Sequence, residues 1–141
     1  MEKLLRKLQK KLNMENSFID LIIRIKNGYM SRKDTIISPF SNFKLAIVKK
    51  LKELKYIKDY KIIEDKFKTI SIDLKYDGKV PAITDVKIFS KGGKRVYVSF
   101  KELKPVVNNF GFSILSTPKG ILTNKEARNQ KTGGELLFNI W

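Results

Sequence analysis

Hydrophobic residues in the first half of the chain recur twice with the spacing of an α-helix. Phe18, Leu21, Ile22 and Ile25 fall at i, i+3, i+4 and i+7, with Asn16 or Ser17 as N-cap and Gly28 as C-terminal stop. A second helix is predicted after Ser41 or Asn42, and its expected buried face is Phe43, Ile47, Val48, Leu51 and Leu54. Lysines, Lys44 among them, crowd the remainder of this helix, so we expect them at the surface.

Between and after these helices the pattern changes to that of β-strands. The run Thr35–Ser38 is β-branched and stops at Pro39, which cannot donate to a ladder. From Tyr60 to Tyr76 the hydrophobic residues alternate with polar ones, which predicts a hairpin. The order helix, strand, helix, hairpin predicts helices packed on one face of a sheet.

Asp77-Gly78 and Pro81 mark a boundary, and a second unit is predicted from residue 79. A strand over Ile83–Phe89 is expected to turn at 91–94 and return as Arg95–Val98, and a short helical stretch is expected from Ser99 to Gly111. The second unit is expected to continue with a strand over Phe112–Leu115 and a tight connection at 116–120. It then has a T-x-x-E capping box at Thr123 and Glu126 and a last strand over Leu136–Trp141.

The chain is therefore predicted to be α/β of the α+β kind, with mostly antiparallel sheets and short helices in two small units that share an interface. We expect a basic amphipathic extension at 1–15, an N-terminal unit at 16–78 and a C-terminal unit at 79–141. The extension has leucines at helical spacing and lacks the features of a secretory signal, so a retained basic helix is expected. A translation start at Met14 is the alternative.

Charge and missing residue types narrow the function. Thirty Lys and Arg against 14 Asp and Glu give a formal net charge of +16, which favours a polyanionic partner. Without Cys or His, the chain has no thiol nucleophile, imidazole base, Cys/His zinc site or Ser-His-Asp triad. No phosphate-binding loop or dinucleotide motif occurs, and no apolar run is long enough to span a membrane. We expect no cofactor, no metal, no small-molecule substrate and no membrane.

RNA offers partners both for a cationic surface and for turns that carry hydroxyl groups. Lysines supply salt-sensitive attraction, whereas short Ser and Thr side chains on a rigid turn discriminate local groove geometry. Tyr97, beside Arg95, is interpreted either as a residue that stacks on a base or as an aromatic that closes the sheet edge. A metal-dependent RNA nuclease and a lysine-rich membrane-surface protein remain alternatives, although the acids are scattered rather than clustered.

Several segments resemble bacterial-type ribosomal protein S-eight, and the resemblance covers residues 16–141. They are Arg24-Ile25-Lys26-Asn27-Gly28, Ser116-Thr117-Pro118-Lys119-Gly120, Thr123 to Arg128, Gly133-Gly134-Glu135 and a terminal aromatic strand. The resemblance implies a non-catalytic, primary binder of small-subunit rRNA that docks on an irregular helix of the central domain and stabilises the platform. It also implies small-subunit proteins five, twelve and seventeen as neighbours.

The resemblance implies roles for individual residues. Ser116, Thr117 and Lys119 correspond to the family's RNA-contacting loop, in which Pro118 replaces a serine and removes a hydroxyl and an N–H. Tyr97 corresponds to the aromatic of a basic-x-Tyr strand that here also carries Lys94 and Arg95, and Lys44 corresponds to a basic residue of the second helix. Gly133 and Gly134 would let backbone approach the loop or RNA, and Glu135 would support the turn rather than bind phosphate directly.

The compartment is predicted from composition alone. Lys, Ile and Asn are abundant, as an AT-rich genome encourages, and there is no convincing transit peptide. We therefore expect an organelle-encoded protein of the mitochondrial matrix or a protein of an AT-rich bacterium, with slight preference for the organelle.

Overall fold

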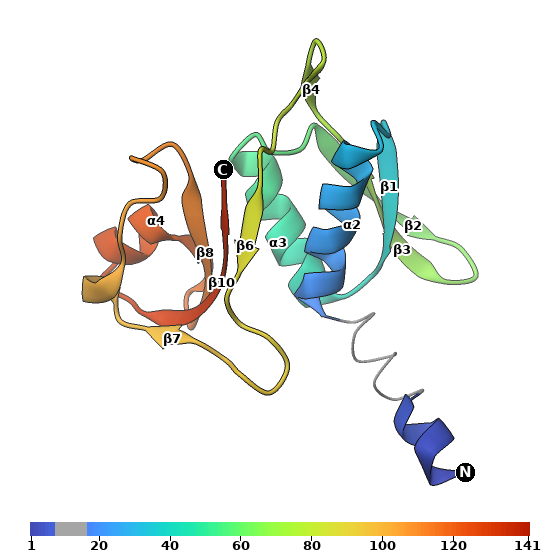
Figure 1. Cartoon of the computed structure of the whole chain (residues 1–141), viewed down its shortest axis with the longest axis horizontal. Coiled ribbons are helices and arrows are strands. Elements are labelled where there is room, and N and C mark those ends of the chain that lie inside the picture. Colours follow the sequence, from blue (N-terminus) through green and yellow to red (C-terminus); the bar gives the residue numbers. More distant parts are fainter. Residues whose placement is uncertain (8–16) are drawn as a thin grey trace. The chain divides into compact units, whose positions relative to one another are not determined.

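The computed structural model describes residues 1–7 and 17–141, and the chain divides into two units, residues 1–82 and 83–141 (Figure 1). Residues 2–7 are helical, with Leu4 and Leu5 exposed. The rest of the expected basic helix, and Met14, lie outside the described residues. The turn at Gly78 belongs to the first unit, because β4 (Tyr76–Asp77) pairs with β5 (Val80–Pro81), so the division falls four residues later than expected.

The first helix, α2 (Phe18–Met30), begins at the predicted cap, where the Ser17 hydroxyl accepts a hydrogen bond from the Asp20 N–H at 3.3 Å. It continues past Gly28, which is not the stop that the sequence suggested. The residue that ends the helix in a left-handed conformation is Arg32, with φ of 57°. Gly28 is instead buried where α2 crosses β1. A Cβ at this position would lie 2.5 Å from Cγ2 of Ile36, so the close crossing requires glycine.

A three-stranded antiparallel sheet carries both helices of this unit. β1 (Thr35–Pro39), β3 (Lys68–Asp73) and β2 (Asp59–Glu64) lie in that order, which confirms the predicted hairpin. Ile36 pairs with Ile72, and these residues with Ile70 form the buried face. Against it pack α2 and α3 (Asn42–Glu53), whose cap is Ser41 (Figure 1).

The Tyr29 hydroxyl ties α2 to two other segments of the first unit. It donates a hydrogen bond to the Tyr56 carbonyl oxygen at 2.6 Å and accepts one from the Lys75 N–H at 3.0 Å. Burial raises the pKa of Tyr29, with the hydrogen bond from Lys75 acting in the opposite direction. The neutral hydroxyl therefore acts as both donor and acceptor and fixes the end of α2 beside the loops that follow α3 and β3.

Lys44 is fully buried in α3, which corrects its assignment to the RNA-binding surface. Its Nζ lies 3.9 Å from Oδ2 of Asp20 on α2, and the same carboxylate oxygen accepts a hydrogen bond from Nε of Arg24 at 2.8 Å. Lys44 stands in the first turn of its helix, where a cation is electrostatically unfavourable. Asp20 thus balances a buried charge between the two helices.

The second unit is built around β10 (Gly134–Ile140). β6 (Val86–Ile88) and β7 (Tyr97–Val98) follow one another along one edge of β10, and β8 (Phe112–Thr117) pairs with the other edge (Figure 1). The expected hairpin between the strands around 83–89 and 95–98 is therefore wrong, although 91–94 does turn. The Ser90 hydroxyl donates to the Leu136 carbonyl at 2.7 Å and accepts from the Val96 N–H, which holds this connection against β10.

The remaining elements extend that sheet by one strand and cover one of its faces. The expected helical stretch over 99–111 is reduced to a single 3-10 turn, Phe100–Glu102, and a strand that the sequence did not predict, β9 (Gly120–Thr123), pairs with β8. The capping box at Thr123 and Glu126 is confirmed and begins α4 (Asn124–Asn129). Behind it the buried cluster is Leu103, Leu115, Leu122 and Ala127.

We expect Gly28→Ala to lower the free energy of unfolding by about 1–2 kcal/mol. The added methyl group collides with the β-branched Ile36, and this overpacking exceeds the ~1 kcal/mol that alanine gains over glycine in a helix. Urea unfolding measures the difference. Gly92→Ala is the matched control, because a Cβ at Gly92 meets no atom within 4 Å. Equal stability of the two variants would contradict the packing argument.

We expect Asp20→Asn to destabilise the chain by about 1–3 kcal/mol, because the buried Lys44 ammonium loses its carboxylate. Lys44→Met keeps most of the volume and removes the charge, so it should cost less than about 1.5 kcal/mol or even stabilise. Urea unfolding of both variants and of the double variant measures the coupling. A larger loss for Lys44→Met than for Asp20→Asn would contradict this account.

Candidate nucleic-acid interface

A row of directly paired residues crosses the sheet of the second unit at one end of β10. Glu135 pairs with Tyr97 of β7 on one side and with Ser116 of β8 on the other, and Ser116 pairs in turn with Ile121 of β9. Residues opposite each other on neighbouring strands project from the same face of a sheet. Tyr97, Glu135 and Ser116, which we call the cross-sheet row, therefore share one face.

The members of the cross-sheet row differ in what they offer to a ligand. Tyr97 is 67% exposed, which leaves it accessible to a ligand. Ser116 is half-buried, and no residue within 1–7 or 17–141 forms a hydrogen bond with its hydroxyl group. An exposed aromatic ring and an uncommitted hydroxyl group thus lie on either side of Glu135.

The Glu135 carboxylate is largely sheltered from solvent. Its side chain is 18% exposed, and Oε1 lies 3.9 Å from Nη1 of Arg95, whose side chain is 69% exposed. The ion pair of this carboxylate is with Arg95, and its expected support of the turn stays a prediction. The pair places the guanidinium beside the carboxylate of the row.

Thr117 holds the turn between β8 and β9 together. Its hydroxyl donates to the Gly120 carbonyl at 2.8 Å and accepts from the Lys119 N–H at 3.2 Å. Gly120 has a φ of 110°, which glycine adopts without strain. Successive residues of a strand point to opposite faces, so Ser116 and Thr117 do not present their hydroxyl groups side by side.

Two glycines allow the strands of the row to approach closely. A Cβ at Gly134 would collide with the Ser116 carbonyl oxygen and lie 3.0 Å from Cγ2 of Thr117. A Cβ at Gly133 would collide with the Val98 carbonyl oxygen and lie 2.9 Å from Cα of Ser99. The expected approach to the loop is therefore present within the protein, and it sets the positions of Ser116 and Tyr97.

The cations predicted for this interface are exposed and belong to the second unit, except one. Lys94, Arg95 and Lys119 are exposed, and Nζ of Lys119 donates to the Gln130 carbonyl at 3.4 Å. Lys94 belongs to the turn in which it bridges to Lys91. Lys44 is buried and belongs to the first unit, so it is not part of this surface.

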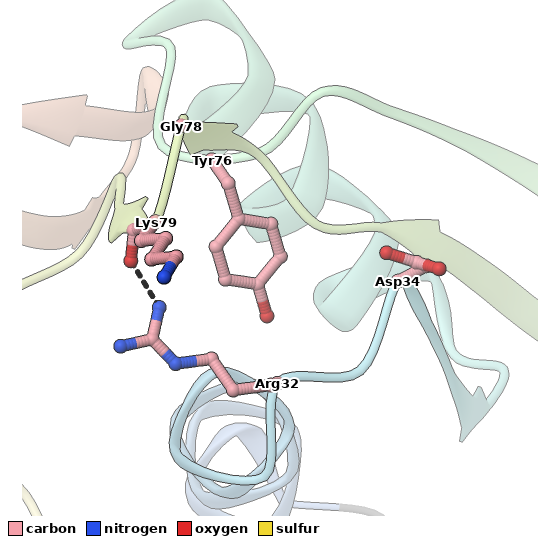
Figure 2. Close-up of a pocket in the computed structure, with 5 residues that line it drawn as sticks. All are labelled: Arg32, Asp34, Tyr76, Gly78 and Lys79. Atoms are coloured by element: carbon pink, nitrogen blue, oxygen red, sulfur yellow. Dashed lines mark hydrogen bonds between the residues drawn. The ribbon is translucent and has the colours of Figure 1, made fainter.

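Sequence reasoning missed a second cationic feature, which lies in the first unit. A pocket of about 500 Å³ is lined by Arg32, Asp34, Tyr76, Gly78 and Lys79 (Figure 2). These residues form no motif, since they come from two separate turns. The only signal available in the sequence was a tyrosine two residues before a glycine and a lysine at the unit boundary.

Neither metal-ligand clusters nor membrane spans are found in the part of the chain that the structure describes. Within residues 1–7 and 17–141, no group of three or more His, Cys, Asp or Glu could hold a metal ion. None of the helices described there has the length and apolarity to cross a membrane.

Comparison with known proteins identifies the family. Residues 16–141 match the family described as "Ribosomal protein S8". The small ribosomal subunit protein uS8 of Dictyoglomus turgidum is 43% identical over 131 residues, which are 92% of this chain and 100% of that protein. The uS8 proteins of Mycoplasmopsis synoviae and Acholeplasma laidlawii are 45% and 42% identical, over 86% and 91% of this chain and 94% and 98% of theirs.

This membership decides between the function classes that the sequence left open. The family consists of structural ribosomal proteins and not of enzymes, so the RNA nuclease has no support. The α+β architecture and the antiparallel sheets described above agree with it. The chain belongs to the ribosomal protein S8 family.

Proposed function

We propose that this protein binds small-subunit rRNA directly, through the cross-sheet row and the cations around it, as a structural constituent of the small ribosomal subunit. The observation that carries the proposal is the register that places Tyr97 and Ser116 on either side of Glu135. An aromatic ring, a free hydroxyl group and a carboxylate-held guanidinium then face the same side of a rigid sheet.

Attraction and recognition have separate sources in this proposal. The net charge of +16 attracts RNA without regard to its sequence and releases counterions on binding. Tyr97 stacks on an exposed base or sugar, and Ser116 donates a hydrogen bond at the shallow minor groove, where 2′-hydroxyl groups and base edges are displayed. Thr117, Gly133 and Gly134 hold these groups in place, and Lys94, Arg95 and Lys119 contact phosphates.

The Glu135 carboxylate limits where on this surface the RNA backbone binds. A carboxylate repels phosphate, so the RNA backbone is favoured on the side of Arg95 and Lys94 rather than directly over the centre of the row. The pair with Arg95 also limits the orientations of a long side chain before binding, which reduces the ordering cost of its phosphate contact.

The place of the protein in the particle follows from the family resemblance. We propose that it docks on an irregular helix of the rRNA central domain, supports assembly of the platform and neighbours small-subunit proteins five, twelve and seventeen. The named relatives are bacterial, which gives the organellar preference no support; the composition also suits an AT-rich bacterium. A structure of the ribosome that contains this chain tests the neighbours and the compartment together.

We expect Tyr97→Leu to weaken binding to the cognate rRNA helix by about 1–3 kcal/mol, because stacking is lost. Ser116→Ala should weaken specific binding more than binding to an unrelated RNA hairpin, because it removes a hydrogen bond and no charge. Filter binding at fixed salt measures both. Phe67→Leu is the matched control, because Phe67 is 75% exposed and belongs to the first unit, whereas the row belongs to the second. Equal losses for Tyr97→Leu and Phe67→Leu would defeat the proposed interface.

We expect Lys94→Gln and Lys119→Gln each to lower the slope of log affinity against log salt concentration by about one phosphate contact. The loss should be nearly the same for the cognate helix and for an unrelated hairpin, because these residues contact phosphate. Lys44→Met serves as the control and should leave the slope unchanged, since the buried ammonium reaches no RNA. An unchanged slope in both exposed-lysine variants would remove them from the interface.

A further inference from the structure

The pocket in the first unit has walls from two segments that two hydrogen bonds join. Arg32 and Asp34 belong to the turn between α2 and β1, and Tyr76, Gly78 and Lys79 belong to the β4–β5 hairpin (Figure 2). The Arg32 guanidinium donates to the Lys79 carbonyl oxygen, and the Tyr76 hydroxyl donates to the Lys33 carbonyl oxygen at 2.7 Å. The two walls are therefore held together before any ligand enters.

The aromatic wall is fixed from behind. Tyr76 packs edge to face on the buried Tyr29, with ring centroids 5.3 Å apart and an interplanar angle of 66°. Burial raises the pKa of Tyr76, Arg32 opposes this effect and Asp34 adds to it, so the hydroxyl stays protonated and keeps its bond to Lys33. The ring is thus a rigid surface for stacking rather than a mobile side chain.

The charged groups of the pocket are set apart from one another. Figure 2 shows the Tyr76 ring between Lys79 on one side and Asp34 on the other, with Arg32 near the Lys79 backbone. The Lys79 ammonium and the Asp34 carboxylate make no hydrogen bond or ion pair with any residue in the described ranges. Two cations, an aromatic ring and a free carboxylate therefore line one hollow of nucleotide size, since small-ligand pockets measure about 300–1,000 Å³.

Arg32 enters the pocket from the left-handed residue that ends α2. Its φ of 57° is a conformation that glycine adopts freely and that costs other L-residues about 1 kcal/mol or more. The guanidinium lies at the pocket wall, where it donates its hydrogen bond to the Lys79 carbonyl oxygen.

We propose that this pocket binds one unstacked ribonucleotide, with its phosphate on Arg32 and Lys79 and its base on the Tyr76 ring. The Asp34 carboxylate only accepts hydrogen bonds, so it favours a base edge that donates them, as guanine does through N1–H and N2–H₂. Gly78 leaves the rim of the hairpin turn open, because a Cβ there would meet no atom within 4 Å. The source of the nucleotide is either a base flipped out of RNA or a free nucleotide, and only the first rests on the proposed RNA binding.

The test follows the Gly78 backbone amide of the full chain by NMR during titration. Guanosine 5′-monophosphate should shift this resonance at lower concentration than ribose 5-phosphate or inorganic phosphate, because the base adds stacking. A single-stranded oligoguanylate that shifts it at still lower concentration identifies RNA as the source, and a weaker effect than that of the mononucleotide identifies free nucleotide. The absence of a shift with all of these probes would overturn the proposal.

Three variants separate the parts of the site. Lys79→Gln should weaken guanosine 5′-monophosphate binding roughly two- to fivefold, as expected for an exposed charge pair. Tyr76→Leu should weaken it at least about fivefold and abolish the advantage over ribose 5-phosphate, whereas Tyr76→Phe, which keeps the ring, should retain that advantage. Lys79→Gln keeps the test decisive if Tyr76→Leu fails to fold. If inorganic phosphate matches the nucleotide in the wild-type chain, the pocket is an anion site only and the proposal fails.

The outcome is independent of the interface in the second unit. Ser116→Ala leaves the pocket residues untouched and should not change the nucleotide titration. A loss of specific rRNA binding in Ser116→Ala with an unresponsive Gly78 amide would retain the proposed function and reject the pocket. The reverse result would retain the nucleotide site and reject the cross-sheet row.

Discussion

The pairing of Glu135 with a strand on each side is the constraint on which the candidate interface depends. Tyr97 and Ser116 are far apart in the sequence, and only the two ladders of β10 bring them to one face. Gly133 and Gly134 make these ladders possible, since a Cβ at either position would collide with the backbone of the neighbouring strand. A surface fixed by backbone pairing is already ordered in the free protein, so the proposed RNA binding costs little conformational entropy.

Sequence patterns predicted the elements whose stability is local. The caps at Ser17, Ser41 and Thr123 depend on residues three positions away, and the β2–β3 hairpin depends on a short turn. Sequence failed where a strand finds its partner far along the chain, as β6 and β7 do on β10. The prediction that Lys44 lies at the surface was wrong for the same reason, because helical periodicity does not reveal that Asp20 of another helix lies beside it.

The candidate interface was predicted from two kinds of sequence evidence, the residues themselves and the resemblance to a family, which differ in how far they specify it. Charge indicated a polyanion and the sequence itself singled out Tyr97, whereas Ser116 and Glu135 came from resemblance to a family. The pairing of the three became visible only in the sheet. The pocket around Arg32 was invisible to both kinds of sequence evidence. It depends on a left-handed residue after α2 and on hydrogen bonds between two turns, neither of which follows from residue spacing.

Carboxylates have a similar role at both places. A surface made only of lysine would hold RNA in many orientations, because every phosphate is an equivalent partner. Glu135 beside Arg95, and Asp34 in a pocket that also contains Arg32 and Lys79, make part of each surface unfavourable for phosphate. In both proposals the phosphates of the ligand are then favoured on the cationic side, and the sugar or base is turned toward the acid. Selectivity in so basic a protein therefore depends on where its few acids stand, rather than on the number of its lysines.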